Sequence, residues 1–180
     1  MRQLLLLRHA KSSWDAADLP DRDRPLNARG RRAAGSMRQA MRDLGLEPDI
    51  VLVSSARRTQ ETLVLLEPWD GTPLIESLDA LYLASPEQLF ATLRGVAETA
   101  RSVMVVGHNP GLHELALSLI GPAGLRDQDT AYREPVGEIV RGFPSGALAE
   151  FSIAGPWSRL GEGGGRLERF LTPHGLEGTG

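Results

Sequence analysis

Short apolar runs alternate with amphipathic stretches along this chain, and that alternation limits the possible folds more than any other feature. Strand-like runs occur within residues 3–7, 49–55, 73–78, 102–110, 147–153 and 166–171. The first, second and fourth runs are continuously apolar, which is typical of strands buried on both faces of a parallel sheet. Because helix-like stretches separate the strands, the sequence predicts an α/β fold with a mostly parallel central sheet and helices on both faces.

The intervening stretches carry helix signals at their ends. Asn27 is the expected N-cap of one helix, and Ser85 with Gln88 supplies the two halves of a capping box for another. A further helix is predicted to end at Gly121, after which the pattern weakens and no helix is predicted. The tail at residues 176–180 is expected to be frayed.

Composition excludes several classes of protein. The chain has 180 residues, a net charge of −3 and no cysteine. This length suits a single domain over residues 1–180, and the lack of cysteine excludes disulfides, zinc–thiolate sites and thiol nucleophiles. The charge provides no basic field for nucleic acid, and the run of leucines is far shorter than the ~20 apolar residues that span a bilayer. We therefore expect a cytoplasmic protein that binds neither nucleic acid nor membranes.

Basic side chains follow the apolar strands at the points where these strands end. Arg8 and His9 follow the first strand, Arg57 and Arg58 follow the second, and His108 follows the fourth. Ligands of parallel sheets gather at the carboxyl ends of the strands, so these side chains are expected to meet at one edge. The convergence predicts a site for an anion, and a phosphoryl group is the anion that it suits.

Phosphoryl transfer needs mainly positioning and charge stabilisation, and these residue types can provide both. Arginines present forked donors that match phosphate oxygens, and a neutral histidine is a competent nucleophile at phosphorus. No metal or cofactor is expected. Two histidines could be metal ligands instead, but no third histidine or carboxylate lies at ligand spacing. The chain also has no Walker-type loop, Gly-x-Gly-x-x-Gly turn or Gly-x-Ser-x-Gly elbow.

Four ordered motifs carry a resemblance to a known family. They are "LLRHAKS", "DRDRPLNARG", "SSARRTQET" and "VVGHNPGL", at or near successive strand ends. Together they resemble the histidine phosphatase superfamily and, within it, the short SixA-type phosphohistidine phosphatases. The resemblance covers roughly the first two thirds of the chain. It implies the three-layer α/β sandwich of the phosphoglycerate-mutase-like fold and a covalent phosphohistidine intermediate.

The resemblance also implies roles for individual residues. His9 would be the nucleophile, and Arg8 and Arg58 would bind the phosphoryl group. His108 would be a second histidine in contact with that group. Arg24 matches a position typical of the SixA-type branch and is assigned to substrate binding, although a solvated loop in which residues 21–24 neutralise one another is the alternative.

Two further residues are assigned to substrate binding because of their neighbours. Lys11, the only lysine of the chain, lies beside His9, and Asn109 follows His108. The general acid that many phosphomonoesterase members use has no clear counterpart, and Glu76 and Asp79 are candidates by position alone. Arg57 could instead form an ion pair with Glu61, which lies four residues later on the same face of the predicted helix.

The expected activity is hydrolysis of a phosphoryl group through a phosphohistidine intermediate, and the first candidate substrate is a histidine-phosphorylated protein. The lack of a clear acid favours a P–N bond, because imidazole leaves with less help than an alkoxide. The alternatives are a phosphomonoesterase for a small metabolite and a phosphate-binding module without catalytic activity.

Overall fold

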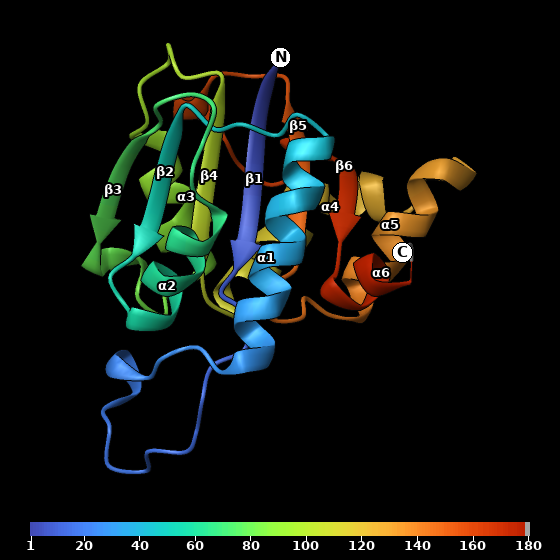
Figure 1. Cartoon of the computed structure of the whole chain (residues 1–180). Coiled ribbons are helices and arrows are strands. Elements are labelled where there is room, and N and C mark those ends of the chain that lie inside the picture. The colour runs from blue at the N-terminus through green and yellow to red at the C-terminus, as the bar shows by residue number, and fades with distance from the viewer. Residues whose placement is uncertain (179–180) are drawn as a thin grey trace.

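Six strands form one mixed sheet with the order β3-β2-β4-β1-β5-β6 (Figure 1). The structure, a computed structural model, describes residues 1–178 of the chain. The strands are β1 (Arg2–Arg8), β2 (Ile50–Ser54), β3 (Leu74–Leu78), β4 (Ser102–Gly107), β5 (Leu148–Ile153) and β6 (Gly165–Leu171). β5 alone runs opposite to the other five strands, so the predicted mostly parallel sheet is confirmed.

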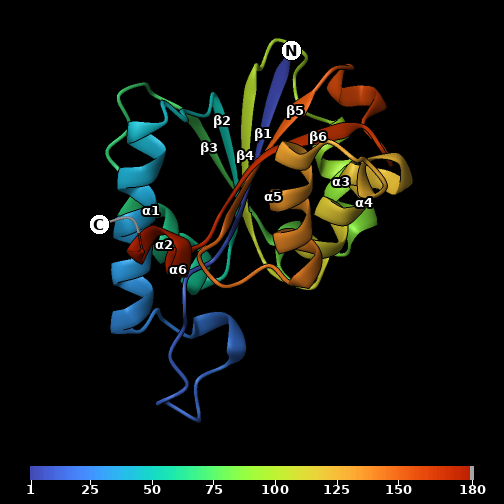
Figure 2. The ribbon, with the colours of Figure 1, turned by 90° about the vertical axis from the view of Figure 1, so that its right-hand side faces the viewer.

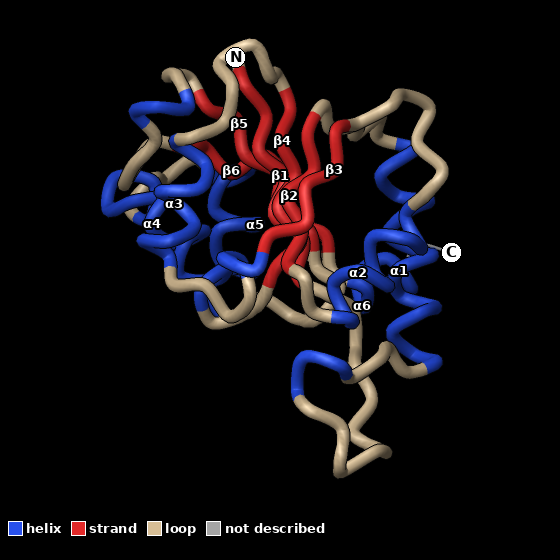
Figure 3. Tube along the Cα trace, turned by 90° about the vertical axis from the view of Figure 1, so that its left-hand side faces the viewer, coloured by secondary structure: helices blue, strands red, loops and turns tan. Residues whose placement is uncertain are grey.

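Helices cover both faces of the sheet, as the sequence predicts. They are α1 (Ala28–Asp43), α2 (Arg57–Leu66), α3 (Pro86–Arg94), α4 (Gly111–Leu125), α5 (Thr130–Arg141) and α6 (Pro173–Glu177). Figure 2 shows α1, α2 and α6 on one face and α3, α4 and α5 on the other, and Figure 3 shows the same layers from the opposite side. Within residues 1–178, no helix is long and apolar enough to cross a membrane.

The leucine run of β1 is apolar throughout because both of its faces are covered. Leu4 and Leu6 belong to the core beneath α3, α4 and α5, whereas Leu5 and Leu7 belong to the core beneath α1 and α2. Successive side chains of a strand point to opposite faces, so a central strand between two helical layers needs apolar residues at every position.

The capping signals are confirmed, but the last third of the chain differs from the sequence prediction. Asn27 caps α1 by accepting from the Gly30 N–H, and Ser85 forms its capping box. α5 was not predicted, because its interior contains a proline, although its buried residues Tyr132, Val136 and Ile139 follow helical spacing.

The end of the chain also differs from expectation. Helical geometry breaks at Gly121, as predicted, because its φ of 65° lies in the left-handed region. The tail was expected to be frayed, but α6 includes Leu176 and Glu177, with Thr172 as its N-cap. Residues 179–180 lie outside the described part of the chain, so the expectation is not tested there.

Candidate active site

The carboxyl ends of β1, β2 and β4 meet at one edge of the sheet, beside the long loop that precedes α1 (Figure 1). The parallel register of β1 and β4 pairs Arg8 with Gly107. The next residue after each is a histidine, so His9 and His108 lie side by side with ring centroids 5.3 Å apart. The predicted meeting of the two histidines is confirmed.

The hydrogen bonds of His9 define which nitrogen carries the proton. Nδ1 lies 2.7 Å from the carbonyl oxygen of Ala10. A carbonyl oxygen can only accept, so Nδ1 carries the proton of the neutral ring and Nε2 keeps its lone pair. The Ala10 N–H donates to Thr62 Oγ1 at 3.0 Å, which fixes the turn after β1 against α2. Nε2 is therefore the ring atom available to attack a substrate.

The surroundings of His9 keep its ring neutral. The pKa of His9 is lowered to about 4, chiefly by burial and then by nearby guanidinium groups, of which Arg58 has the largest effect. The hydrogen bond to Ala10 acts in the opposite direction. At pH 7 the ring is uncharged, and this is the protonation state that a nucleophilic imidazole requires.

His108 is held between a serine and an arginine. Its Nε2 lies 2.7 Å from Ser54 Oγ, and its Nδ1 lies 3.3 Å from Nη2 of Arg58. A guanidinium group can only donate, so Nδ1 accepts and the proton of the neutral ring is on Nε2. Burial, followed by the neighbouring His9 and Arg58, lowers the pKa of His108 to about 3. Both histidines of the site are thus neutral at pH 7.

Arg57 and Arg58 are adjacent in α2 but face different surroundings. Arg58 is 3% exposed, and its guanidinium group donates to the carbonyl and the carboxylate of Asp21 at 2.7 and 3.0 Å. Arg57 is exposed and its Nε donates to Glu61 Oε2 at 3.0 Å. The predicted surface pair of Arg57 with Glu61 is confirmed, and Arg58 is the arginine that enters the site.

Arg8 and Asn109 share one backbone acceptor. Nη1 of Arg8 and Nδ2 of Asn109 both donate to the carbonyl oxygen of Phe143, at 3.0 and 2.9 Å. Arg8 Nε and Asn109 Oδ1 are buried and have no hydrogen-bond partner among the described residues. Buried polar atoms without partners are uncommon. The free donor of Arg8 and the free acceptor of Asn109 could therefore both form hydrogen bonds with a polar ligand.

Asp21 was missed as a site residue, because the sequence analysis offered only a self-neutralising loop for it. Its carboxylate accepts from Arg58, lies 3.2 Å from Nε of Arg24, and accepts a hydrogen bond from the Tyr82 hydroxyl. The bond from Tyr82 has the largest effect in lowering the pKa of Asp21, and Arg58 and Arg24 lower it further. Asp21 is therefore an ionised partner for the arginines, not an acid.

Arg24 lines the site. The alternative of a solvated loop is wrong for it because the side chain is buried, although the pairing of charges within residues 21–24 is present as its contact with Asp21. Arg24 is 7% exposed, and its Nη2 donates to Ser12 Oγ at 3.0 Å. Its guanidinium carbon lies 3.4 Å from the ring centroid of Trp14. Stacking on an aromatic face fixes the plane of the guanidinium group. The fixed plane would allow Arg24 to donate two parallel hydrogen bonds to an anion.

The assigned residues line one cleft of about 420 Å³. Its lining comprises Arg8, His9, Lys11, Ser12, Trp14, Asp21, Arg24, Arg58, Leu83, His108, Asn109 and Ser145. Every residue assigned to catalysis or substrate binding from the sequence is in this set. The acid candidates Glu76 and Asp79 are not, because Glu76 is exposed on the edge strand β3 and Asp79 accepts from Ser55 and Arg22.

Tyr82 gave no signal in the sequence, whereas Ser54 did. Tyr82 contacts Asp21, but a single tyrosine in a loop has no distinguishing pattern. Ser54 contacts His108, and it lies at the end of β2, where ligands are expected, as the first residue of the motif "SSARRTQET". Among residues 1–178, no group of three or more His, Asp or Glu side chains could hold a metal ion.

The lowered pKa values predict how stability changes with pH. Each histidine has a pKa in the folded state below its ordinary value, so the unfolded chain binds more protons below about pH 6.5. The free energy of unfolding should therefore fall as the pH is lowered from about 6.5 towards 4. Urea denaturation followed by tryptophan fluorescence at pH 7, 6 and 5 measures this, and the loss should be smaller in His9→Gln/His108→Gln. An equal loss in both proteins would contradict the assignment.

Comparisons with known proteins agree with this geometry. The family model of the histidine phosphatase superfamily (branch 1) matches residues 4–81. An uncharacterized chloroplastic protein of Arabidopsis thaliana is 32% identical over 183 residues, 96% of this chain and 78% of that protein. An uncharacterized protein of Mycobacterium tuberculosis is 32% identical over 167 residues, 93% of this chain and 99% of that protein. The chain belongs to the histidine phosphatase superfamily.

Solved structures of histidine phosphatases share the fold along the whole chain. A candidate SixA phosphohistidine phosphatase from Nakamurella multipartitia is 30% identical, with a TM-score of 0.81 over 96% of each chain. A second, from Agrobacterium tumefaciens, is 28% identical, with a TM-score of 0.79 over 96% of this chain and 98% of that one. The protein histidine phosphatase SixA complexed with tungstate has a TM-score of 0.75 at 23% identity, over 97% of this chain and 99% of that one, and shows the fold alone. The predicted phosphoglycerate-mutase-like sandwich is confirmed.

Proposed function

We propose that residues 1–180 form a single phosphatase domain that hydrolyses phosphohistidine in proteins through a covalent intermediate on His9. The observation that carries the proposal is a neutral His9 whose Nε2 is unprotonated in a cleft lined by three arginines. Such a ring can attack phosphorus, and guanidinium groups can stabilise the charge on the transferring phosphoryl group.

The first step forms a bond between His9 Nε2 and phosphorus and breaks the P–N bond of the substrate. The leaving imidazole takes the bonding electron pair and a proton from water. As the His9 ring gains positive charge, its Nδ1–H bond to the Ala10 carbonyl strengthens, which favours the intermediate. In the second step water adds to phosphorus, the N–P bond breaks, and its electron pair returns to Nε2. The attacking water gives one proton to the hydroxide left by the first step, so the products are hydrogen phosphate and the enzyme in its starting state.

Arg8, Arg24 and Arg58 are proposed to hold the phosphoryl oxygens during both steps. They line one cleft, and among residues 1–178 the carboxylate of Asp21 is their only carboxylate partner in it. A phosphoryl dianion would also raise the pKa of His108, since an opposite charge nearby favours the protonated ring. Protonated His108 would donate from Nε2 to Ser54, and its Nδ1, which would no longer accept from Arg58, would donate to a phosphoryl oxygen.

The lack of a protonated carboxyl group in the cleft, within the described residues, favours a P–N bond over a phosphate ester. Asp21 is the one carboxylate that lines the cleft within the described residues, and its lowered pKa keeps it ionised. An alkoxide leaving group needs a proton from a positioned acid, whereas imidazole leaves with less help. This supports a histidine-phosphorylated protein as substrate over the sugar phosphates of a metabolic phosphomonoesterase.

A comparison of substrates tests the proposed function. Initial rates would be measured on a histidine-phosphorylated phosphotransfer protein, phosphoramidate, a phosphoserine peptide and a panel of sugar phosphates. We expect kcat/KM for the phosphohistidine protein to exceed that for every ester by about a hundredfold or more, which corresponds to ~2.7 kcal/mol of transition-state stabilisation. A sugar phosphate with the highest value would indicate the metabolic phosphatase instead, and no turnover of any substrate would indicate a binding module.

Metal independence is a separate prediction of this mechanism. The arginines and His108 supply the positive charge that a metal ion would otherwise provide, so EDTA should leave initial rates within about twofold of the untreated enzyme. Vanadate should inhibit, because it adopts the five-coordinate geometry of the transferring phosphoryl group. Activity that is lost in EDTA and restored by a divalent cation would contradict the prediction.

The cytoplasmic location expected from the sequence stays a prediction. The name of the Arabidopsis relative assigns that protein to the chloroplast, so relatives of this chain are not confined to one compartment.

A further inference from the structure

A second hollow adjoins the cleft and shares part of its wall. It has a volume of about 390 Å³, and Lys11 and Ser145 line both. The rest of its lining comes from α1, from the residue before Ser145 and from the start of α6. These residues are Arg29, Ala33, Pro144, Thr172, Pro173 and His174. The two hollows therefore lie next to each other, with Lys11 and Ser145 between them.

Two glycines allow the walls of the second hollow to approach each other. Gly30, in the first turn of α1, lies so close to the backbone of Lys11 that an added Cβ would be 2.1 Å from the Lys11 carbonyl oxygen. Gly146 has a φ of 77°, and a Cβ there would lie 3.1 Å from Cγ of Pro173. A larger side chain at Gly30 would push α1 away from Lys11, and one at Gly146 would push α6 away from the segment before β5. The walls of the hollow therefore depend on these two close contacts.

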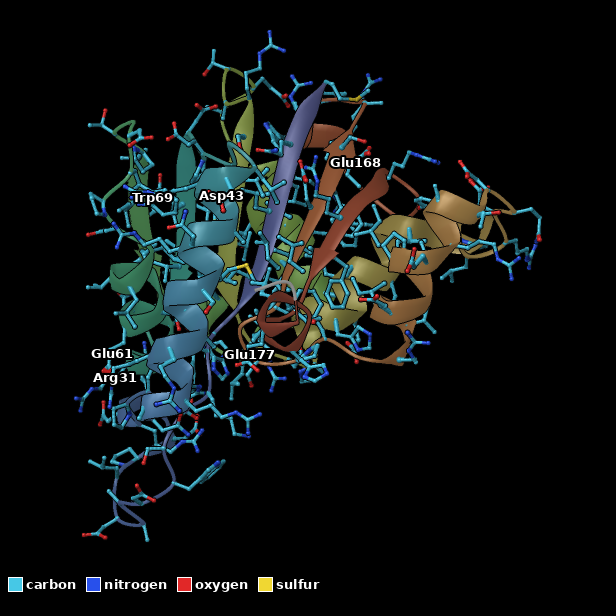
Figure 4. All side chains as sticks on the ribbon, turned by 45° about the vertical axis from the view of Figure 1, so that its right-hand side comes forward. Arg31, Asp43, Glu61, Trp69, Glu168 and Glu177 are labelled. Carbon is cyan, nitrogen blue, oxygen red and sulfur yellow. The ribbon has the colours of Figure 1, made fainter. Side chains whose placement is uncertain are left out.

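The lining of the second hollow is basic and contains no carboxylate. Lys11, Arg29 and His174 are exposed, and none of them has an ion pair or a side-chain hydrogen bond within residues 1–178. Figure 4 labels Arg31 near the start of α1 and Glu177 on α6, the two helices that flank the hollow. Arg31 donates instead to the Leu26 carbonyl, and Glu177 does not line the hollow.

We propose that this second hollow binds a carboxylate side chain of the phosphoprotein substrate, near its phosphohistidine, while the phosphoryl group occupies the cleft beside His9. The inference rests on the proposed function and adds a preference for acidic residues around the phosphorylated histidine. Lys11 and Arg29 are cationic, and they attract an anion that is covalently attached to a group bound in the adjacent cleft.

The size of the two hollows and the apolar side chains at their mouth favour binding of a protein segment. The hollows together, at about 420 and 390 Å³, exceed the space that one phosphoryl group and one imidazole need. Trp14 and Leu83 line the first cleft although 73% and 53% of their surfaces are exposed, which provides apolar contact area at its mouth. Large exposed apolar side chains beside a polar cleft are typical of surfaces that receive another protein.

Binding of two matched peptides tests the inference without requiring turnover. Both peptides would carry a non-hydrolysable phosphoryl-triazole in place of phosphohistidine, with Glu in one and Gln in the other at every flanking position within four residues. Calorimetry should give a Kd about fivefold lower for the Glu peptide, since two or three exposed charge pairs contribute modestly. The preference should fall as salt is raised from 50 to 500 mM, because exposed charges are screened.

Substitutions locate the preference in the second hollow. In Arg29→Gln/His174→Asn, which keeps Lys11, the ratio of the two Kd values should fall to about half of its wild-type value or less. Arg101→Gln removes the same charge from an exposed side chain at the opposite end of β4 and should keep the wild-type ratio. Equal affinity of wild type for the two peptides, no binding of either, or the same loss in Arg101→Gln would overturn the inference. Failure of the proposed function is distinguishable, because it would appear as no turnover of histidine-phosphorylated protein even though both peptides bind.

Discussion

His9→Ala is expected to reduce turnover by at least about a thousandfold while the protein stays folded, because the nucleophile has no substitute in the cleft. The ring lies at the end of β1 in a polar cleft, and neither apolar core contains it. Rates would be measured on a histidine-phosphorylated protein, and circular dichroism with thermal unfolding would report the fold. His113→Ala is the matched control, since His113 contacts the Ile139 carbonyl and does not line the cleft.

The same variant tests the covalent intermediate. Brief reaction of the wild type with labelled substrate, followed by alkaline quenching and peptide mapping, should place acid-labile phosphate on His9. The label should be absent in His9→Ala. Phosphate on a serine, or turnover of His9→Ala at the wild-type rate, would refute the assignment of His9 as nucleophile.

Arg58→Ala should lower kcat by about a hundredfold or more, whereas Arg57→Ala should change it by less than about threefold. Arg58 is buried in the cleft beside His108, so its removal takes a charge-assisted donor from the transition state. Arg57 lies on the surface, where its pair with Glu61 contributes only ~0.2–0.5 kcal/mol to the helix. The measurement is kcat at saturating substrate, with unfolding free energies of both variants as the control for folding.

The comparison of two neighbouring arginines is sharp because the variants differ only in which face of α2 loses its charge. Consecutive residues of a helix point about 100° apart, so the two guanidinium groups cannot exchange roles. A larger fall in kcat for Arg57→Ala would show that the motif "SSARRTQET" is used in another register. Equal, small effects would show that Arg8 and Arg24 are sufficient to hold the phosphoryl group.

Short-range patterns were enough to predict most of the frame of this protein. The strands, the capped helices and the strand-end positions of His9 and His108 follow from local periodicity and from a topological rule. The register of β1 with β4 then brings the two rings together without further information. The missed helix α5 shows the limit of this approach, because a proline inside it and a weak apolar stripe obscure the local signal.

The sequence by itself determined which strand-end residues meet at one edge of the sheet, because the carboxyl ends of parallel strands lie together there. It could not determine which carboxylate balances the positive charge of the arginines at that edge. That depends on where the long loop before α1 packs against the strand ends. Only the tertiary structure brings Asp21 against Arg58 and Tyr82, and defines the neutral tautomers of both histidines. The second hollow also depends on the tertiary structure, since Lys11, Arg29 and His174 come from three separate segments. Contacts between such distant segments depend on the packing of the whole chain, and no local pattern encodes them.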